Sequence, residues 1–471
     1  MVGLNSATPE QEMATTAARA SEDSCRALSK RVGPLTIGGI RHSTLTLCCT
    51  ALGSGVLAAS YVMRLVGVGL GITLLLVGAA LAFASTNVLM QACQETGHDT
   101  YAGLFAHCTG GSGGAILDVM LVVYGNGACV GFMVFLSDFV PSLVTLVFPS
   151  SPAWLASRWF AIFLAVLIIL PLAVQRDLAV LRFVTPMSIA ALVYMAMTVA
   201  IKSAFRVNSN DPARGDIRFA IASLSLPEAF SVCVFAFNCH INVVPVAGNM
   251  VRATKARIFK VSAMVNLVQL TFYLLIGVTG YLSFLEKTPQ DIVKAYPDND
   301  VAVAVGRFML TGSMLVGIPI NIIPTVRSGL QLVGHLCPRL LGDDGPLLTD
   351  ASAASAAAAN SELSVETSIV QAPTLGRPFR PQAERVRVLL SICFLLMQAF
   401  LAIKVPGVVN VLSLLGATVV TAMMMAIPAY CMGRIQTMTP KNRMLQITFY
   451  FFSLVSLASV PIKILTWCTV I

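Results

Sequence analysis

The residues with the clearest capacity for chemistry interrupt two hydrophobic segments of this 471-residue chain. One interruption is Gly53–Gly55, and the other is Asn238–Asn242, shortly before Pro245. Inside hydrocarbon, non-helical backbone is tolerated only where it lines a cavity or is buried in protein, so each interruption needs a reason. Paired interruptions in corresponding spans of two halves indicate the central site of a secondary transporter.

The first interruption has the chemistry of an anion site. The N-terminus of a half-helix carries about half a positive charge and suits a carboxylate. Gly53 and Gly55 leave their backbone amides bare and tolerate φ > 0. The alternative is a packing contact between helices like that of the Gly-x-x-x-Gly pattern, although the Gly-x-Gly spacing differs from it.

Four further polar residues of the predicted spans are candidates for function, because charge inside a bilayer is costly. Asp138 either caps a helix or pairs with Arg307, or it is a protonatable group coupled to transport. His240 either titrates near neutrality or hydrogen-bonds to freed carbonyls. Glu228 is expected near the outer mouth, where it could attract cationic substrates, and Asp118 is expected to be structural.

These residues must be positioned by membrane-spanning helices. The chain is 56% hydrophobic and 11% charged, with a mean hydropathy of +0.80. A window of about 19 residues predicts roughly eleven spans. They are expected near 42–66, 67–93, 111–147, 158–175, 183–203, 224–249, 258–285, 301–326, 386–405, 407–432 and 445–467. The third is predicted to be one long helix, because a turn at Gly125–Gly127 would leave a first half too short to cross.

The distribution of the 31 Lys and Arg residues predicts the orientation. Most of them fall on the cytoplasmic side if the N-terminus is cytoplasmic and the C-terminus lies outside, although the four after the fifth span oppose this. Residues 1–40 lack the apolar region of a signal peptide and are predicted to form a disordered cytoplasmic tail. The Ala- and Ser-rich stretch 341–382 is predicted to be a flexible cytoplasmic loop, or else a regulatory segment.

The spans divide into two sets of five, and the broken helix is the first member of each. Residues 41–203 and 224–432 would form these two sets, and 445–471 would form the eleventh helix and C-terminus. Because five is odd, the second set must run with inverted topology. The twelve cysteines and five histidines show no metal-ligand spacing, so we expect no metal, no cofactor and no enzymatic activity. The net charge of +9 follows from topology and predicts no nucleic-acid partner.

Six motifs in order give the chain a resemblance to the amino acid/auxin permease family of the amino acid–polyamine–organocation superfamily, including its system A/N-type and protozoan members. The motifs are Leu52–Leu57 (LGSGVL), Thr100–Leu104 with Gly110, Gly127–Val130 with Asp138 and Pro141, Pro171-Leu172, Phe235–His240 (FAFNCH), and Pro319 with Pro324 and Arg327. The last has one extra residue before the Arg. The resemblance covers about residues 40 to 467.

The resemblance implies an all-α membrane protein with a LeuT-like fold: ten helices in two inverted repeats of five, plus one more. It implies a free amino acid as substrate, held in the bilayer by the unwound parts of the two broken helices. Its carboxylate would be bound by the backbone N–H groups of Gly53, Ser54, Gly55 and Val56. Phe237 and Asn238 would face its α-amino group and side chain.

The resemblance also bears on the driving ion. In sodium-coupled members of the family, an Asn and a Thr supply sodium ligands at the places that Cys49 and Gly317 occupy here. Thiol sulfur is a poor ligand for a hard cation, and glycine offers no side chain. We therefore expect sodium-independent transport driven by protons or exchange, with Asp138 or His240 titrating. Ser313 or Thr311 could replace the lost ligands only through a shift in register.

Three alternatives stay open. The same pocket could serve an amino acid sensor that does not transport. A polyamine transporter would leave the carboxylate site without a purpose. The absence of an acidic residue from the interruptions favours a neutral substrate, whereas Asp138 and Glu228 leave a cationic amino acid open. We expect the plasma membrane rather than a vacuolar or lysosomal membrane, and the sequence predicts no oligomeric state.

Overall fold

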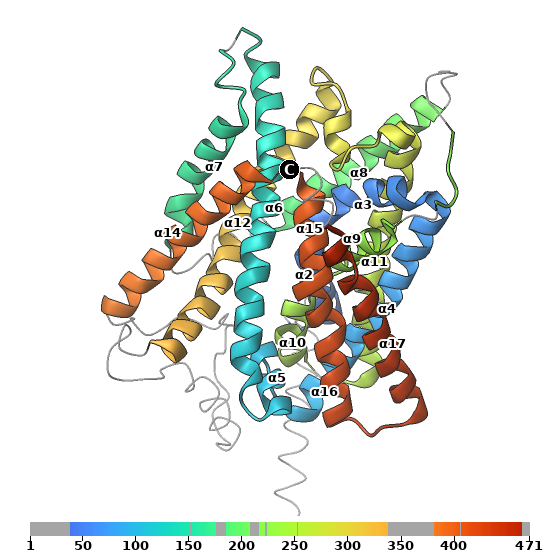
Figure 1. Cartoon of the computed structure of the whole chain (residues 1–471), viewed down its shortest axis with the longest axis vertical. Coiled ribbons are helices and arrows are strands. Elements are labelled where there is room, and N and C mark those ends of the chain that lie inside the picture. The colour runs from blue at the N-terminus through green and yellow to red at the C-terminus, as the bar shows by residue number, and fades with distance from the viewer. Residues whose placement is uncertain are drawn as a thin grey trace, which may run out of the picture.

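A computed structural model of the chain is built from α-helices, with no strand among the residues it describes (Figure 1). The structure describes residues 38–150, 152–175, 185–207, 216–221, 224–251, 253–337, 381–405 and 407–463. The predicted tail up to residue 37, the predicted loop 341–382 almost throughout, and residues 464–471 lie outside this description.

The helices of the N-terminal half run from α2 to α8. They are α2 (Ile40–Ala51), α3 (Ser54–Val66), α4 (Val68–Thr96), α5 (Tyr101–Thr109), α6 (Gly113–Val147), α7 (Arg158–Ala173) and α8 (Thr185–Val207). Two of them begin where a side-chain oxygen accepts a backbone N–H: Thr100 caps α5 and Ser157 caps α7. N-terminal caps of this kind determine the residue at which each helix begins.

The C-terminal half runs from α9 to α17. Its elements are α9 (Leu226–Ala236), α10 (His240–Gly248), α11 (Lys255–Phe284), the short η2 (Leu285–Lys287) and η3 (Ile292–Ala295), α12 (Val301–Leu336), α14 (Pro381–Lys404), α15 (Val408–Leu415), the π-helical η5 (Gly416–Val420) and η6 (Ala422–Ala426), α16 (Ile427–Ile435) and α17 (Pro440–Leu457). Figure 1 places α5 near one end of the bundle and the connection from α11 to α12 near the other; we call these the α5 end and the η3 end.

By length and composition, nine of the described helical segments could cross a membrane, and the bent pair α2–α3 would make a tenth. The apolar helix α7 is shorter than these. The chain is therefore an all-helical, multi-pass membrane protein, as the sequence predicts.

The third predicted span is one helix, α6, as expected. Its glycines pack against neighbouring helices, and they do not form a turn. A Cβ atom on Gly125 would lie within 3.0 Å of the Thr325 Cβ on α12, and one on Gly127 would lie 2.7 Å from Leu415 Cδ2. The Gly-Asn-Gly sequence thus allows α12 and α15 to approach α6 closely.

Three features of the helices differ from the predicted spans. The short helix α5, between α4 and α6, was not predicted. The helix α12 continues ten residues past the predicted boundary at 326, to Leu336. The tenth span is divided into α15, two π-helical segments and α16, with Gly416 so close to α9 that a Cβ would lie 2.8 Å from the Ser231 carbonyl carbon.

Candidate functional site

The two predicted helix interruptions are present. The chain bends by 60° between α2 and α3, at Leu52-Gly53. The second interruption is Phe237–Cys239, between α9 and α10. It is shorter than the predicted Asn238–Asn242, and the predicted boundary is wrong because the Asn238 side-chain oxygen accepts the His240 N–H at 3.3 Å. That contact starts α10 at His240, two residues earlier than the predicted end of the interruption.

The half-helices associate in two pairs. α3 packs against α9, and α2 packs against α10. The second pair is joined by a hydrogen bond from the Asn242 amide to the Thr50 hydroxyl, at 2.9 Å. In the first pair the beginning of α3 meets the end of α9, so a positive helix terminus lies beside a negative one. A zwitterionic ligand requires a partial positive charge beside its carboxylate and a partial negative charge beside its amino group, and these two helix ends offer both.

Gly55 and Ala236 are the point at which α3 meets α9. A Cβ atom on Gly55 would lie 2.7 Å from the Ala236 Cα, and a contact this short is essentially never observed for a Cβ atom in proteins. The predicted reason for the glycines is wrong, because neither has a positive φ: Gly53 has φ −131°, and Gly55 lies in the first turn of α3. Gly55 is therefore needed for a close helix contact, which is the packing alternative that its spacing argued against.

Two of the four predicted carboxylate donors already have backbone partners. The Gly53 N–H donates to the Ala51 carbonyl at 2.9 Å, and the Val56 N–H donates to the Gly53 carbonyl at 3.3 Å. The N–H groups of Ser54 and Gly55 belong to the first turn of α3, where an α-helix leaves N–H groups without intrahelical partners. These two amides are the better candidates for holding an anion.

Tyr273 of α11 joins the two interruptions, and sequence reasoning missed it. Its hydroxyl donates to the Ala236 carbonyl and lies 3.2 Å from the Ala51 carbonyl. Those carbonyls end α9 and α2, so one fully buried side chain holds the last turn of both broken helices. A tyrosine in an apolar span whose hydroxyl must find a partner is the signal that could have found it.

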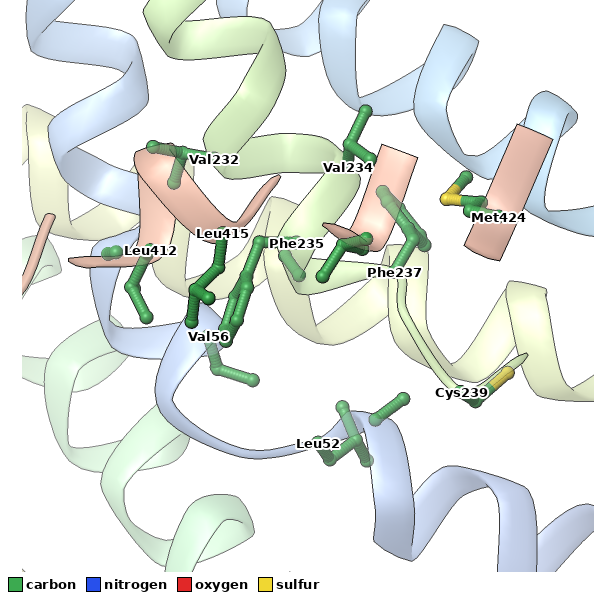
Figure 2. Packing of buried hydrophobic residues seen from close by; sticks show 14 of the residues in the cluster. Leu52, Val56, Val232, Val234, Phe235, Phe237, Cys239, Leu412, Leu415 and Met424 are labelled. Atoms are coloured by element: carbon green, nitrogen blue, oxygen red, sulfur yellow. The ribbon is translucent and has the colours of Figure 1, made fainter. Parts of the chain in front are cut away.

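The aromatic residues of the second interruption face different neighbours. Phe237, a predicted substrate contact, is fully buried and packs edge-on against Tyr273, with ring centroids 4.8 Å apart. Its ring also faces Gly78 of α4, where a Cβ would lie 3.1 Å from Phe237 Cδ2. Figure 2 shows Phe235 beside Leu415 and Val56, with Phe237 apart from this group. Phe235 is thus the aromatic side chain that lies between the first interruption and α15.

Asn238 and His240 present buried polar atoms without partners. Asn238 Oδ1 lies 3.3 Å from His240 Nδ1, and the Tyr124 hydroxyl of α6 lies against the same amide. Asn238 Nδ2 and His240 Nε2 have no hydrogen-bond partner among the described residues. Buried polar groups are satisfied in nearly all proteins, so such atoms mark a place where a polar ligand or water belongs.

A second polar cluster, also missed from the sequence, lies behind this interruption. Ser85 and Thr86 of α4 and Gln269 of α11 are fully buried, and their polar atoms lack hydrogen-bond partners within the described part of the chain. Cys239, whose thiol is a weak partner, lies against Thr86 and Gln269. The interruption is therefore bordered by uncharged donors and acceptors.

The ion pairs of Asp138 and Arg307 differ from the predicted one. Asp138 pairs with Lys294 of η3 at 3.0 Å. Arg307 pairs with Asp298 at 2.9 Å and donates to the carbonyls of Val293 and Tyr296. The predicted Asp138–Arg307 pair is wrong because the segment before α12 folds back over the end of α6 and supplies both partners.

Glu228 is paired too. Lys463, beyond α17, lies 2.6 Å from its carboxylate and 2.6 Å from the Asn410 side-chain oxygen. A carboxylate held by a lysine offers little to a cationic substrate, because its charge is already compensated.

Gly53 of the first interruption and Gly317, one of the two positions where sodium-coupled relatives have an ion ligand, lie beside the same aromatic ring. A Cβ on Gly53 would be 3.7 Å from the Phe132 ring of α6, and one on Gly317 would be 3.6 Å from it. The Gly317 carbonyl accepts the Asn321 amide at 2.8 Å. Cys49 and Ser313 are half-buried. Phe132 therefore lies between the first interruption and the middle of α12.

The family of transmembrane amino acid transporter proteins has a model that matches residues 37–466 of this chain. A putative amino acid transporter AAT1 of Toxoplasma gondii is 33% identical over 66% of this chain and 43% of its own length. The sodium-coupled neutral amino acid transporter 7 of Danio rerio is 28% identical over 57% of this chain and 59% of its own. The vacuolar amino acid transporter 6 of Saccharomyces cerevisiae is 23% identical over 83% of this chain and 89% of its own. The matches thus span about half the length of the first two relatives.

Proposed function

This chain belongs to the transmembrane amino acid transporter family, and on that premise we propose that it carries free amino acids across a membrane as a secondary transporter. The observation that carries the proposal is the meeting of α3 and α9 at Gly55 and Ala236, with the Tyr273 hydroxyl at the carbonyls of both interruptions. These contacts hold the two interruptions in a fixed position relative to each other. A bend without a function would not require that.

The substrate would lie across the two interruptions. We propose that the Ser54 and Gly55 amides receive its carboxylate, because the N-terminus of α3 concentrates N–H donors and positive potential there. The freed carbonyls and Asn238 would receive its α-amino group. Phe235 and the uncharged cluster of Thr86 and Gln269 favour a neutral substrate over a cationic one.

Transport would proceed by alternating access. In this proposal the first repeat, 41–203, and the second, 224–432, move against each other around the site. The pairing of α3 with α9 and of α2 with α10 supports the idea, because it divides the broken helices into an η3-end pair and an α5-end pair. Opening one pair while the other stays closed would expose the site to one side only. The N-terminus would be cytoplasmic and the η3 end would face away from the cytoplasm.

We propose that transport is independent of sodium and driven by protons or exchange. The relative in Danio rerio is sodium-coupled by name, whereas Cys49 and Gly317 place a thiol and a bare backbone where sodium-coupled members of the family are expected to have oxygen ligands. The Phe132 ring beside Gly317 supports the same reading, because it fills the neighbouring space with carbon. Asp138 and His240 are the candidate titrating groups, and we place the protein in the plasma membrane.

Purified protein in liposomes tests transport itself. Uptake of a labelled neutral amino acid, saturable and abolished by Gly53→Val, is the expected result. Saturable binding without uptake would instead favour a sensor that uses the same pocket. Uptake of a labelled polyamine in preference to amino acids would overturn the carboxylate site, because that ligand has no carboxylate. Competition by the twenty amino acids against one tracer would then rank the substrates.

A further inference from the structure

The segment from Leu285 to Tyr296, which we call the lid, connects helices on several sides of the η3 end. It includes η2 and η3. On one side Arg64 of α3 donates to the Thr288 carbonyl at 2.7 Å. On another the Val409 N–H of α15 donates to the Gln290 side chain at 3.2 Å. The lid thus ties the outer half of the first broken helix to α15.

The lid is also tied to α6 and α12. Lys294 binds Asp138 of α6, and Arg307 of α12 donates to the carbonyls of Val293 and Tyr296 at 3.0 and 2.8 Å. Ile292 and Val293, in the η3 part of the lid, are fully buried. To expose the site from the η3 end, these contacts would have to part.

Asp291 is a buried carboxyl group within the lid. It is only 3% exposed, and its Oδ1 accepts the Val293 N–H at 3.0 Å. Its Oδ2 has no partner among the described residues. An ionised carboxylate in this position would be buried with one oxygen unsatisfied, which is costly.

The cations around Asp291 compensate an ionised carboxylate only in part. The groups that act on it are Asp138 of α6, Lys294 of η3 itself and Arg307 of α12. Lys294 is bonded to Asp138, and Arg307 to Asp298 and two carbonyls. On α3, which also packs against η3, Arg64 is turned to Thr288. No cation on these elements bonds the Asp291 carboxyl, and the nearby Asp138 repels its charge.

We propose that Asp291 is a proton-binding site of the lid: the closed lid holds a proton on Asp291, and loss of that proton opens the lid. Burial, and then the charge of Asp138, raise the pKa of Asp291 to about 8 in the closed structure. A water-exposed aspartate in an open lid would titrate near 4. The proton linkage of the lid stands by itself, whereas its use in transport rests on the proposed function.

The direction of the effect follows from this difference. The closed state binds the proton more tightly, so acid conditions favour it. As the pH rises between the two pKa values, the ratio of closed to open lid falls by about tenfold for each pH unit. Above the higher pKa value this ratio no longer changes. The substitution Asp291→Asn mimics the neutral carboxyl group in shape and cannot ionise.

Hydrogen–deuterium exchange of purified protein in detergent measures the lid without requiring transport or a known orientation. The readout is the protection factor of peptides from 285–296, corrected for the intrinsic pH dependence with an unstructured peptide in the same sample. We expect the parent's protection to fall by about tenfold per pH unit between about pH 5.5 and about pH 7.5. Asp291→Asn should stay protected across this range.

Two further variants make the result decisive. Glu286→Gln, which neutralises an exposed carboxylate of the lid itself, should keep the parent's pH dependence. Asp138→Asn should reduce the change in protection with pH, because it removes the charge that repels ionised Asp291. If Asp291→Asn does not fold, this reduction still tests the proposal. A flat profile in the parent, or the parent's slope in Asp291→Asn, would overturn it.

These outcomes separate the lid from the transport mechanism. A pH-dependent lid in a protein that takes up no amino acid would leave the proton site intact and reject the proposed function. Uptake without a pH-dependent lid would do the reverse.

Discussion

Gly55 of α3 lies so close to Ala236 of α9 that no side chain fits between them: a Cβ on Gly55 would sit 2.7 Å from the Ala236 Cα and 2.9 Å from its Cβ. The contact joins the start of one broken half-helix to the end of the other. It therefore fixes how the two interruptions face each other, and it separates the roles of the two glycines in the first interruption.

Gly55→Val should lower both the stability of the protein and its uptake activity, whereas Gly53→Val should lower only the uptake activity. Overpacking against backbone costs about 1–3 kcal/mol or more, so Gly55→Val should lower the thermal midpoint and abolish uptake. A Cβ on Gly53 meets only the Phe132 ring, at 3.7 Å, so Gly53→Val should keep a near-normal midpoint and still lose uptake by crowding the carboxylate. Thermal unfolding by fluorescence and uptake into liposomes measure the two effects. Near-normal uptake by Gly53→Val would reject the carboxylate site.

Tyr273→Phe should weaken both interruptions at once. Without the hydroxyl, the buried carbonyls of Ala51 and Ala236 lose a hydrogen-bond donor. An unsatisfied buried group costs about 1–3 kcal/mol, so the thermal midpoint should fall and the KM for the amino acid should rise. Tyr450→Phe, on the exposed face of α17, is the matched control and should change neither. An unchanged KM in Tyr273→Phe would show that the hydroxyl does not position the site.

Asn238→Ala should alter which amino acids are preferred. The side chain caps α10 through the His240 N–H and leaves its own Nδ2 without a partner in the described structure, so its loss changes the polar surface of the interruption. Competition by each of the twenty amino acids against one labelled tracer measures the ranking. Asn249→Ala, an exposed amide just past the end of α10, is the control. A ranking identical to the parent's would remove Asn238 from the pocket.

Replacement of external sodium by a large organic cation should leave uptake largely intact. The thiol of Cys49 and the bare Gly317 supply no oxygen side chain for a hard cation. If protons drive the cycle, collapse of the pH gradient should depress uptake by at least about half, as measured in liposomes with an ionophore. An absolute requirement for sodium would contradict the assignment and point to Ser313 or Thr311 as ligands.

Most of the helices and both interruptions can be predicted from the amino-acid sequence, although the short helix α5 and the division of the tenth span were not. Glycines and polar residues in the middle of apolar spans are local signals, and helix formation depends mostly on local hydrogen bonds and hydropathy. The length of α6 followed from the same reasoning, because a bilayer requires about 20 apolar residues per crossing. The position of the candidate site at the two interruptions needed no more than this.

Which residues meet is a property of the folded chain and could not be predicted from the sequence. Gly55 opposes Ala236, Tyr273 joins carbonyls of α2 and α9, and Asp138 pairs with Lys294 in place of Arg307. The partners are separated by more than 30 residues in every case, and by more than 150 in most, so no local pattern encodes them. Side-chain hydrogen bonds and ion pairs depend on distances of a few ångströms, which are set by how the helices pack. Asp291 is a further example. In the sequence it lies between two predicted spans, where an aspartate is usually exposed, and its burial near Asp138 follows only from the fold of the lid.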